Sequence, residues 1–259
     1  METKKILVTG AAGFLGRGLI IPFEDHDYRL RLMDVVPFES RHEVVVGSVA
    51  DYDTVEKAVA GVSGIVIAHM APRGEGNVNY QSPTMPFDIN IKGTAYLLHA
   101  AVKHGVKKVV VISSEAAVMA NPEGNRRHDS PLRAKEYYGL SKICQEVMAE
   151  QFSREHGMQI ACLRPGYILD GDANVDKYGR VIGERNAADT DRRDIGEVAR
   201  LCLESPTLTY DVFHVMSTQE SMKLLDVQYT CDTLGWKPKY DFSWLPTYEE
   251  ARAAEAAKK

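Results

Sequence analysis

A glycine-rich turn between a short apolar run and a helical pattern constrains the fold of this sequence most strongly. The run from Ile6 to Val8 is followed directly by Thr9-Gly10-Ala11-Ala12-Gly13-Phe14-Leu15-Gly16, with glycines three residues apart. Glycine lets a backbone approach a bulky anionic group, and the start of the next helix offers N–H donors and a favourable dipole. In this strand-to-helix context the string predicts a site for the pyrophosphate of a dinucleotide, rather than a turn used only for packing.

An acidic residue at the end of the second apolar run supports that interpretation. Asp34 lies 18 residues after Gly16, where a carboxylate accepts hydrogen bonds from the ribose hydroxyls of adenosine. Because the same charge repels a 2′-phosphate, NAD is the expected cofactor. Arg17 and Arg31 are basic residues that could hold a 2′-phosphate, and they leave NADP as an alternative.

Short apolar runs alternate with helical patterns, which is typical of βαβ units with helices on both faces of a parallel sheet. The expected strands are Ile6 to Val8, Leu30 to Met33, Val44 to Val46, Ile65 to Ala68, Val109 to Ile112 and Ile160 to Leu163. The expected helices are Phe14 to Phe23, Thr54 to Ala60, Phe87 to Lys103 and Glu136 to His156. This arrangement predicts an α/β protein with a doubly wound parallel sheet of the Rossmann type.

The clear alternation ends after the sixth expected strand. A polar stretch, a helical pattern and an apolar run follow, at Asp170 to Asp194, Ile195 to Leu203 and Val212 to Val215. We expect one Rossmann-type domain over residues 1–259. Within it, residues 1–168 would form the cofactor-binding core, and residues 169–259 would mostly form a small C-terminal substrate-binding region. The end, from Tyr248 to Lys259, is expected to be a solvated helix or a frayed tail.

Composition argues against several classes of partner. The formal net charge is −5, whereas nucleic acids and anionic membranes attract basic surfaces, so neither is expected to bind. No apolar run approaches the ~18 residues of a membrane span, and the chain enters its first strand without a signal-peptide core. We therefore expect a cytoplasmic protein with a small-molecule substrate. The cysteines and histidines show no ligand spacing, and no metal site is expected.

A tyrosine and a lysine on the last long expected helix predict acid–base chemistry. Tyr138 and Lys142 are four residues apart and share a face, whereas Tyr137 is rotated away. Lowering a phenol pKa from ~10 to ~7 takes about 4 kcal/mol of phenolate stabilisation, which Lys142 and a positive nicotinamide would supply. Ser114, just after the fifth expected strand, would hold the substrate oxygen. This set predicts removal of a hydroxyl proton while hydride leaves the same carbon.

Six segments carry these residues in a fixed order along the chain: Thr9 to Gly16, Ile67 to Ala71, Asn90 to Thr94, Ser113-Ser114, Tyr138 to Lys142 and Leu163 to Gly166. Their order and spacing resemble the extended branch of the short-chain dehydrogenase/reductase superfamily, which comprises epimerases, dehydratases and sugar dehydrogenases. The resemblance implies a Rossmann fold, NAD as cofactor, and Ser114, Tyr138 and Lys142 as catalytic residues. It also implies a homodimer through the two longest expected helices.

The resemblance further implies contacts along the whole cofactor. Ala71 would pass beneath the nicotinamide ribose, which Lys142 would also hold, and Asn90 would lie beside the active site. The segment from Pro165 to Ile168 would lie against the nicotinamide, and Ser48-Val49 would lie near the adenine, where relatives usually carry an acidic residue. The full set expected at the cofactor is Gly10, Ala12, Gly13, Phe14, Leu15, Gly16, Asp34, Ser48, Val49, Ala71, Asn90, Tyr138, Lys142, Pro165, Tyr167 and Ile168.

The short region after the sixth expected strand narrows the substrate class. Only 26 residues separate Gly166 from Arg193, fewer than nucleotide-sugar epimerases and dehydratases use to hold a nucleoside diphosphate. This compact build resembles the uronate dehydrogenases, which oxidise free hexuronic acids with NAD. Glu115-Ala116 stands where those enzymes carry Asn and His, and a carboxylate there favours a neutral sugar or polyol. Arg180 would serve as their substrate-carboxylate arginine, and Arg73 lies in another active-site loop.

The expected substrate-binding residues are therefore Arg73, Ser114, Glu115, Tyr138 and Arg180. The expected activity is NAD-dependent oxidation of a hydroxyl or hemiacetal of a small sugar, uronic acid or polyol, with Tyr138 as general base. One alternative is a nucleotide-sugar epimerase or dehydratase that retains its NAD. A second alternative, from another class, is a sensor or scaffold that binds NAD without turnover. The polar loop from Pro72 to Pro86 is expected to cover the substrate.

Overall fold

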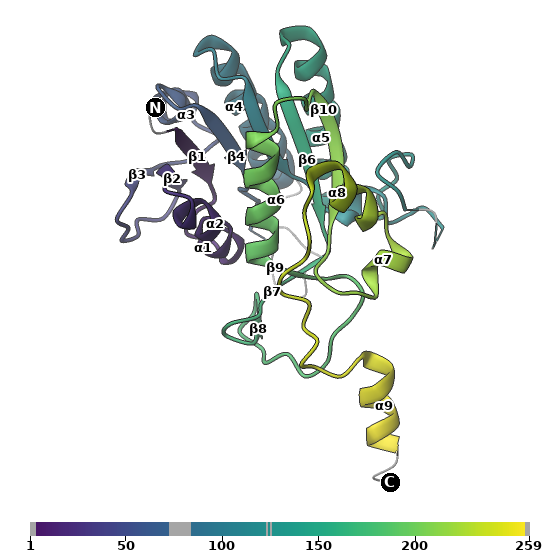
Figure 1. Cartoon of the computed structure of the whole chain (residues 1–259). Helices are drawn as coiled ribbons and strands as arrows, with labels where there is room; N and C mark the ends of the chain where they lie inside the picture. Colours follow the sequence, from purple (N-terminus) through teal and green to yellow (C-terminus); the bar gives the residue numbers. More distant parts are fainter. Residues whose placement is uncertain (1–3, 73–83, 123, 125, 257–259) are drawn as a thin grey trace.

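A seven-stranded parallel sheet with helices on both faces forms the body of the molecule (Figure 1). The computed structural model describes residues 4–72, 84–122, 124 and 126–256, and all structural statements refer to these residues. The strands are β1 (Lys5–Thr9), β2 (Arg29–Asp34), β3 (Glu43–Val46), β4 (Gly64–Ile67), β5 (Lys108–Ile112), β6 (Gln159–Pro165) and β10 (Tyr210–Val215). Their order is β10-β6-β5-β4-β1-β2-β3, so the chain winds in opposite directions from the β1–β4 pair. This is the predicted doubly wound α/β fold, which places a ligand crevice at the carboxyl ends of β1 and β4.

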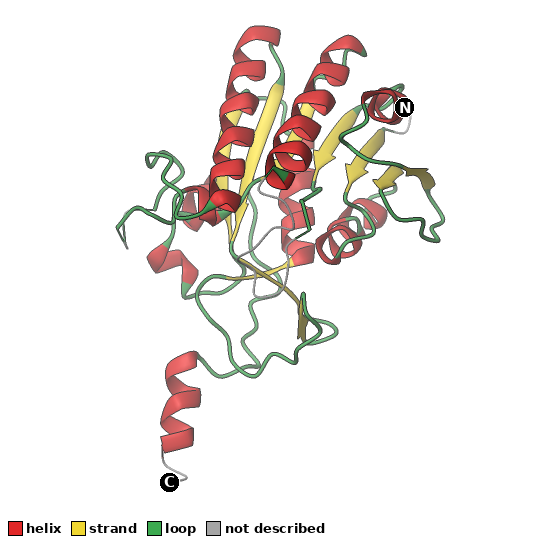
Figure 2. Cartoon of the chain, turned by 180° about the vertical axis from the view of Figure 1, so that it is seen from behind, coloured by secondary structure: helices red, strands yellow, loops and turns green. Residues whose placement is uncertain are grey.

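Alternate residues of each strand point to opposite faces of the sheet and build two separate cores. In β5, Val110 and Ile112 belong to one core, whereas Val109 and Val111 belong to the other. The first core lies under α1 (Phe14–Leu19), α2 (Ile21–Asp25), α6 (Arg192–Glu204) and α8 (Val227–Leu234). The second lies under α3 (Tyr52–Val59), α4 (Gly93–Lys103) and α5 (Tyr137–His156), as the reverse view shows (Figure 2). Burial on both faces explains why the strands read as continuous apolar runs.

The prediction of six strands was one strand short. All six expected strands are present, with ends that differ by no more than two residues. The apolar run at Val212 to Val215, predicted to belong to the substrate-binding region, instead forms most of β10 and pairs in parallel with β6. The connection between these two parallel strands includes α6, which serves as the crossover helix. The main sheet therefore extends well past residue 168 of the sequence. That the rest of the C-terminal region binds the substrate stays a prediction.

Two expected helices are interrupted. The helix expected from Phe14 to Phe23 divides into α1 and α2, because Pro22 lies at the start of α2 and lacks an N–H to continue the first helix. The helix expected from Phe87 to Lys103 begins as a π-helix, η2 (Phe87–Lys92), before it continues as α4. Irregular turns of this kind occur frequently at functional sites.

A second, three-stranded sheet lies beyond the carboxyl ends of the main sheet. It consists of β7 (Tyr167–Asp170), β8 (Val175–Asp176) and β9 (Asp189–Asp191) in the order β8-β7-β9. The remaining short helices are η3 (Glu115–Ala117) and α7 (Ser221–Leu224). The last helix, α9 (Tyr248–Ala256), stands away from the body in both views, as expected for a solvated end (Figures 1 and 2).

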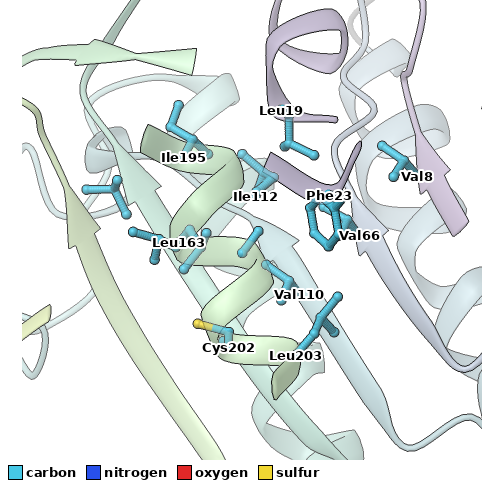
Figure 3. Packing of buried hydrophobic residues seen from close by; sticks show 14 of the residues in the cluster. Val8, Leu19, Phe23, Val66, Val110, Ile112, Leu163, Ile195, Cys202 and Leu203 are labelled. Atoms are coloured by element: carbon cyan, nitrogen blue, oxygen red, sulfur yellow. The ribbon is translucent and has the colours of Figure 1, made fainter. Parts of the chain in front are cut away.

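Helix α6 packs into the first core through residues spaced three and four apart (Figure 3). Ile195, Cys202 and Leu203 face the strands, and Leu19 and Phe23 lie alongside them. Gly196 permits the close crossing of α6 with the end of α1, because a Cβ atom there would lie 2.3 Å from the carbonyl oxygen of Leu19. The two helices therefore approach each other at a distance that no larger residue allows.

Substitution Gly196→Ala is expected to destabilise the fold by about 1–3 kcal/mol, because the added methyl group forces the α1–α6 crossing to open. Urea denaturation measures the change in the free energy of unfolding. The control is Gly183→Ala, since a Cβ atom at Gly183 meets nothing within 4 Å, and a change below about 0.5 kcal/mol is expected there. A more stable Gly196→Ala protein would mean that the helix propensity of alanine, worth up to ~1 kcal/mol, outweighs the contact.

Candidate active site

One cavity of about 1080 Å³ runs along the carboxyl ends of the central strands. This volume slightly exceeds the roughly 300–1,000 Å³ typical of ligand pockets. The glycine turn and Asp34 line it on the β1–β2 side, and Ser114, Tyr138 and Lys142 line it on the β5–β6 side. The structure therefore brings both sequence motifs into the same cavity. All residues expected at the cofactor line this cavity except Ala71 and Asn90.

The glycine turn is built from close backbone contacts. Gly10 has a φ of +70°, which glycine adopts without strain, and a Cβ atom there would lie 2.8 Å from the Cα of His69. A Cβ atom on Gly16 would lie 2.3 Å from the carbonyl oxygen of Gly10. Helix α1 starts after Gly13, and this N-cap residue supplies no side-chain hydrogen bond to the first N–H groups of the helix. The geometry fits an anionic group held by backbone N–H donors.

Asp34 is fixed beside this turn by backbone hydrogen bonds. Its Oδ2 accepts from the N–H of Ala12 at 3.0 Å, and its Oδ1 accepts from the N–H of Val35 at 2.7 Å. The two arginines considered for a 2′-phosphate do not line the cavity. Arg31 donates to Glu43 at 2.7 Å and to the carbonyl oxygens of Ala58 and Ala60 at 2.8 and 2.7 Å. Arg17 donates to the carbonyl oxygen of Ala12 at 3.0 Å.

His69, in the cavity wall, is held in one neutral form. The Oγ1 of Thr9 accepts from the backbone N–H groups of Ala68 and His69, so its own hydrogen is directed to the Nδ1 of His69, 3.0 Å away. The Nε2 of His69 then donates to the carbonyl oxygen of Ile89 at 3.1 Å. Burial, followed by the positive charge of Lys142, lowers the pKa of His69 to about 3. His69 is therefore a connector between β1, β4 and η2 and not an acid–base group at neutral pH.

Tyr138 and Lys142 lie on one face of the first turns of α5. The Nζ of Lys142 donates to the carbonyl oxygen of Ile112 at 2.7 Å and lies 5.7 Å from the centre of the Tyr138 ring. Ser114 follows the end of β5, and its Oγ accepts from the N–H of Ala116 at 3.2 Å, which caps η3. The neighbouring Tyr137 is 59% exposed and does not line the cavity. A hydroxyl, a phenol and an ammonium group therefore line the same part of the molecule, the cavity wall beside the end of β5 and the start of α5.

Asn90 does not line the cavity, and its side chain instead bonds to two residues beside it. The π-helix η2 places its buried side chain between two elements of the site. Its Oδ1 accepts from the N–H of Ala71 at 2.7 Å, and its Nδ2 donates to the Oγ of Ser141 at 2.9 Å. Ser141 in turn donates to the carbonyl oxygen of Tyr138 at 2.7 Å. Asn90 thus connects the segment after β4 with the first turn of α5.

The substrate side contains charged groups that sequence reasoning did not combine. Glu115 lines the cavity but is only 6% exposed, and the Nη1 of Arg126 donates to its Oε1 at 2.7 Å. Arg180 does not line this cavity, because its guanidinium bonds to Asp176 and to the hydroxyl of Tyr167 beside a second cavity of about 250 Å³. Lys177, from the same turn as Arg180, lines the large cavity instead.

Neither Arg126 nor Lys177 carried a signal in the sequence. Arg126 belongs to an irregular loop with no periodicity, and its partner Glu115 is fixed only by the tertiary fold. In the turn between residues 176 and 180 the chain reverses, so residues a few positions apart point to different cavities. Arg73 and most of the loop from Pro72 to Pro86 lie outside the described residues.

The fold and this site define a dinucleotide-binding protein of the extended short-chain dehydrogenase/reductase type. Residues 6–169 match the family model described as the NAD dependent epimerase/dehydratase family. This match covers more than half of the 259 residues, and the chain belongs to that family.

Individual relatives include enzymes with different substrates. A uronate dehydrogenase of Pseudomonas syringae pv. tomato is 36% identical over 169 residues, which cover 62% of this chain and 58% of that protein. A 3-beta-hydroxysteroid dehydrogenase of Mycolicibacterium neoaurum is 28% identical over 173 residues, which cover 63% of this chain and 47% of that protein. The crystal structure of a uronate dehydrogenase from Agrobacterium tumefaciens superposes with a TM-score of 0.73 at 25% identity, covering 100% of this chain and 91% of the other. The match thus spans less than two thirds of either sequence relative.

Two structural findings bear on location and metals. Among the helices of the described residues, none combines the length and apolar character needed to cross a membrane. In the same part of the chain, no group of three or more His, Cys, Asp or Glu side chains is placed to hold a metal ion. A cytoplasmic location stays a prediction.

The lowered pKa of His69 predicts a loss of stability in acid. The unfolded chain takes up a proton on His69 below pH ~6.5, whereas the folded protein does so only near pH 3, so stability falls as the pH drops through this window. Relative to a His69→Gln variant, which cannot titrate there, the wild type should lose about 2 kcal/mol of unfolding free energy between pH 7 and pH 5. Urea titrations of both proteins at the two pH values measure this difference. Parallel pH dependences would show that folded His69 protonates normally.

Proposed function

We propose that this protein is an NAD-dependent dehydrogenase that oxidises a hydroxyl or hemiacetal of a small sugar, sugar acid or polyol. The observation that carries the proposal is the convergence of Tyr138, Lys142 and Ser114 in the cavity that the glycine turn also lines. If the glycine turn served only for the packing of β1 against α1, nothing would require a phenol and an ammonium group at the other end of the same cavity. Their shared location favours proton removal from a substrate hydroxyl.

The cavity residues fit the cofactor that the family description names. The N–H groups after Gly13 would hold the pyrophosphate, and Asp34 would accept hydrogen bonds from the adenosine ribose. When bound, NAD would supply the hydride acceptor. The structure favours NAD over NADP, because the guanidinium of Arg31 would have to leave Glu43 and two carbonyl oxygens to reach a 2′-phosphate.

Each catalytic side chain then has a defined task. The Tyr138 oxygen would take the proton of the substrate hydroxyl, and the Lys142 ammonium group would stabilise the phenolate by its charge. The Ser114 hydroxyl would donate a hydrogen bond to the substrate oxygen and hold it beside Tyr138. Lys142 is only 3% exposed and is anchored to the carbonyl oxygen of Ile112, so its charge is fixed in position.

The substrate side supports a polar small molecule and does not exclude an acidic one. Glu115 alone would oppose an anion, but the ion pair with Arg126 offsets its charge. Lys177 adds a cation to the cavity wall. Two of the proteins compared above are uronate dehydrogenases by name, which keeps a sugar acid within the proposed substrate class.

Two alternatives to the proposed dehydrogenase can be distinguished from it by one experiment. An epimerase or dehydratase would oxidise a sugar transiently and keep its NADH, and the family includes such enzymes. The compact region around β7, β8 and β9 argues against the nucleoside diphosphate that those enzymes hold. A sensor or scaffold would bind NAD without turnover, and such a protein gains nothing from Tyr138 and Lys142 in this arrangement.

The proposal predicts NADH formation from purified protein, NAD and at least one compound in a panel of hexuronic acids, neutral aldoses, polyols and hydroxysteroids. Substitution Tyr138→Phe should lower kcat by about 10²–10⁴-fold, because it removes the group that accepts the proton. Tyr137→Phe is the matched control and should leave kcat unchanged, since Tyr137 does not line the cavity. NADP should support much less turnover than NAD.

The other outcomes of this assay separate the alternatives. An inactive protein that carries NADH through purification favours the epimerase or dehydratase. An inactive protein that gains thermal stability with NAD, to the same degree in Tyr138→Phe, favours the sensor. Equal activity of Tyr138→Phe and the wild type would disprove the assignment of the base.

We also propose a homodimer through the outer faces of α4 and α5. Val102 on α4 is 36% exposed, and Leu140 and Val147 on α5 are 40% and 51% exposed. Residues 140 and 147 are seven apart and lie on the same side of α5. An apolar face on two neighbouring helices suits an isologous interface.

The double variant Val102→Glu/Val147→Glu should therefore be monomeric, because it places paired carboxylates in the interface. Sedimentation velocity at micromolar concentration would show the wild type as a dimer and this variant as a monomer. Val181→Glu is the control, since Val181 is 76% exposed but belongs to neither helix and pairs instead with Val175 of β8 through an isolated bridge. A monomeric wild type would rule out the proposed dimer.

A further inference from the structure

A buried ion pair joins helix α5 to strand β6 behind the catalytic residues. Glu146 on α5 and Arg164 on β6 have side chains that are 1% and 2% exposed. The Nε of Arg164 donates to the Oε1 of Glu146 at 2.9 Å, and its Nη2 donates to Oε2 at 2.7 Å. The Oε1 of Glu146 also accepts from the Oγ of Ser113 at 2.5 Å. Neither member of the pair lines the large cavity, so neither is placed to contact a ligand there.

The pair continues a line of contacts between α5 and the end of β5. Tyr138, Lys142 and Glu146 are each four residues apart and therefore lie along one face of α5. Lys142 bonds to the carbonyl oxygen of Ile112, and Glu146 bonds to the side chain of Ser113, the next residue. The residue after that is Ser114. Two successive polar contacts therefore fix how far α5 is shifted along its axis relative to the end of β5, the strand that precedes Ser114.

Arg164 extends the same connection to two further segments. It directly precedes Pro165, where the chain leaves β6 and lines the cavity. Its Nη1 donates to the carbonyl oxygens of Arg127 and His128, at 3.2 Å each. That loop also carries Arg126, the partner of Glu115. The guanidinium group of Arg164 thus joins β6 to α5 and to this loop, and Glu146 adds the contact with Ser113.

A buried ion pair such as Glu146–Arg164 is expected to contribute little to the free energy of unfolding. The loss of hydration on burying two charges largely offsets their attraction, and apolar side chains of similar volume commonly serve as well. A bidentate pair differs from an apolar contact in its direction, because both hydrogen bonds require a defined angle between the two planar groups. The geometry therefore points to a role in position and not in stability.

We propose that Glu146 and Arg164 are positioning residues for the reaction: they set the placement of Ser114 relative to the Tyr138–Lys142 pair, and proton transfer depends on them although they touch neither ligand. This inference rests on the proposed dehydrogenase function. Because misplacement of a reacting group by about 1 Å can reduce the rate by about 10²-fold, the effect belongs to kcat. The sites for the pyrophosphate at the glycine turn and for the adenosine ribose at Asp34 involve neither residue, so NAD affinity should change much less than kcat.

The test uses two variants that leave the net charge unchanged. The double variant Glu146→Leu/Arg164→Met replaces the pair with apolar groups, and Ser113→Ala removes one hydroxyl while the pair stays intact. We expect kcat to fall about 10- to 100-fold in the double variant and about tenfold in Ser113→Ala, with NAD affinity within about twofold of the wild type. The matched control is Ser153→Ala, which removes a buried hydroxyl near the other end of α5 that donates to the carbonyl oxygen of Met158 and does not line the cavity. Its kcat should stay within about twofold.

Wild-type kcat in Ser113→Ala and in a stably folded double variant would overturn the proposal. If the double variant does not fold, Ser113→Ala decides the question alone. A crystal structure of Ser113→Ala supplies a readout that needs no turnover: a lost or lengthened bond between Lys142 and the carbonyl oxygen of Ile112 supports positioning, and an unchanged one overturns it. If the wild type oxidises nothing in the panel, the proposed function fails, and this structural readout still decides whether the pair positions the helix.

Discussion

The reversal of strand order between β1 and β4 is the constraint on which the rest of the structure depends. The chain leaves β1 toward β2 and leaves β4 toward β5, so the connecting helices diverge and leave a crevice at the carboxyl ends of the two strands. The backbone must pass close to itself to form the floor of that crevice. Gly10 and Gly16 meet this requirement, because a Cβ atom at either position would collide with backbone atoms.

Polar side chains then connect the walls of the crevice. Thr9 and His69 link β1 with η2, Asn90 links the segment after β4 with α5, and Glu146 links α5 with β5 and β6. Each of these contacts is buried and directional, and each replaces hydrogen bonds that the groups would otherwise make with water. Apolar packing could hold the same elements together, but it tolerates sliding more readily. Hydrogen bonds therefore hold the walls of the crevice together, whereas the two cores on either side of the sheet consist of apolar residues.

The sequence predicted those features that depend on neighbours in the chain. Continuous apolar runs revealed the six expected strands, and the four-residue spacing of Tyr138 and Lys142 revealed their common face. Strand β10 was harder to assign, because Asp211 and His214 interrupt its apolar pattern and only its pairing with β6 places it in the sheet. The same limit applies to the site. The pairing of Glu115 with Arg126, and the turn that sends Arg180 and Lys177 toward different cavities, arise from tertiary contacts that no local pattern encodes.

The ion pair of Glu115 and Arg126 determines whether this part of the cavity would select a ligand by its charge or by the positions of its hydroxyl groups. A lone carboxylate would act mainly through charge and would reject anions at long range. A carboxylate paired with an arginine has little net charge, but it still accepts hydrogen bonds in a fixed direction. Selection then depends on whether a substrate hydroxyl meets that oxygen, because a buried polar group left without a partner costs about 1–3 kcal/mol. A site of this kind would distinguish the positions of hydroxyl groups on a ligand more sharply than it would distinguish the ligand's charge.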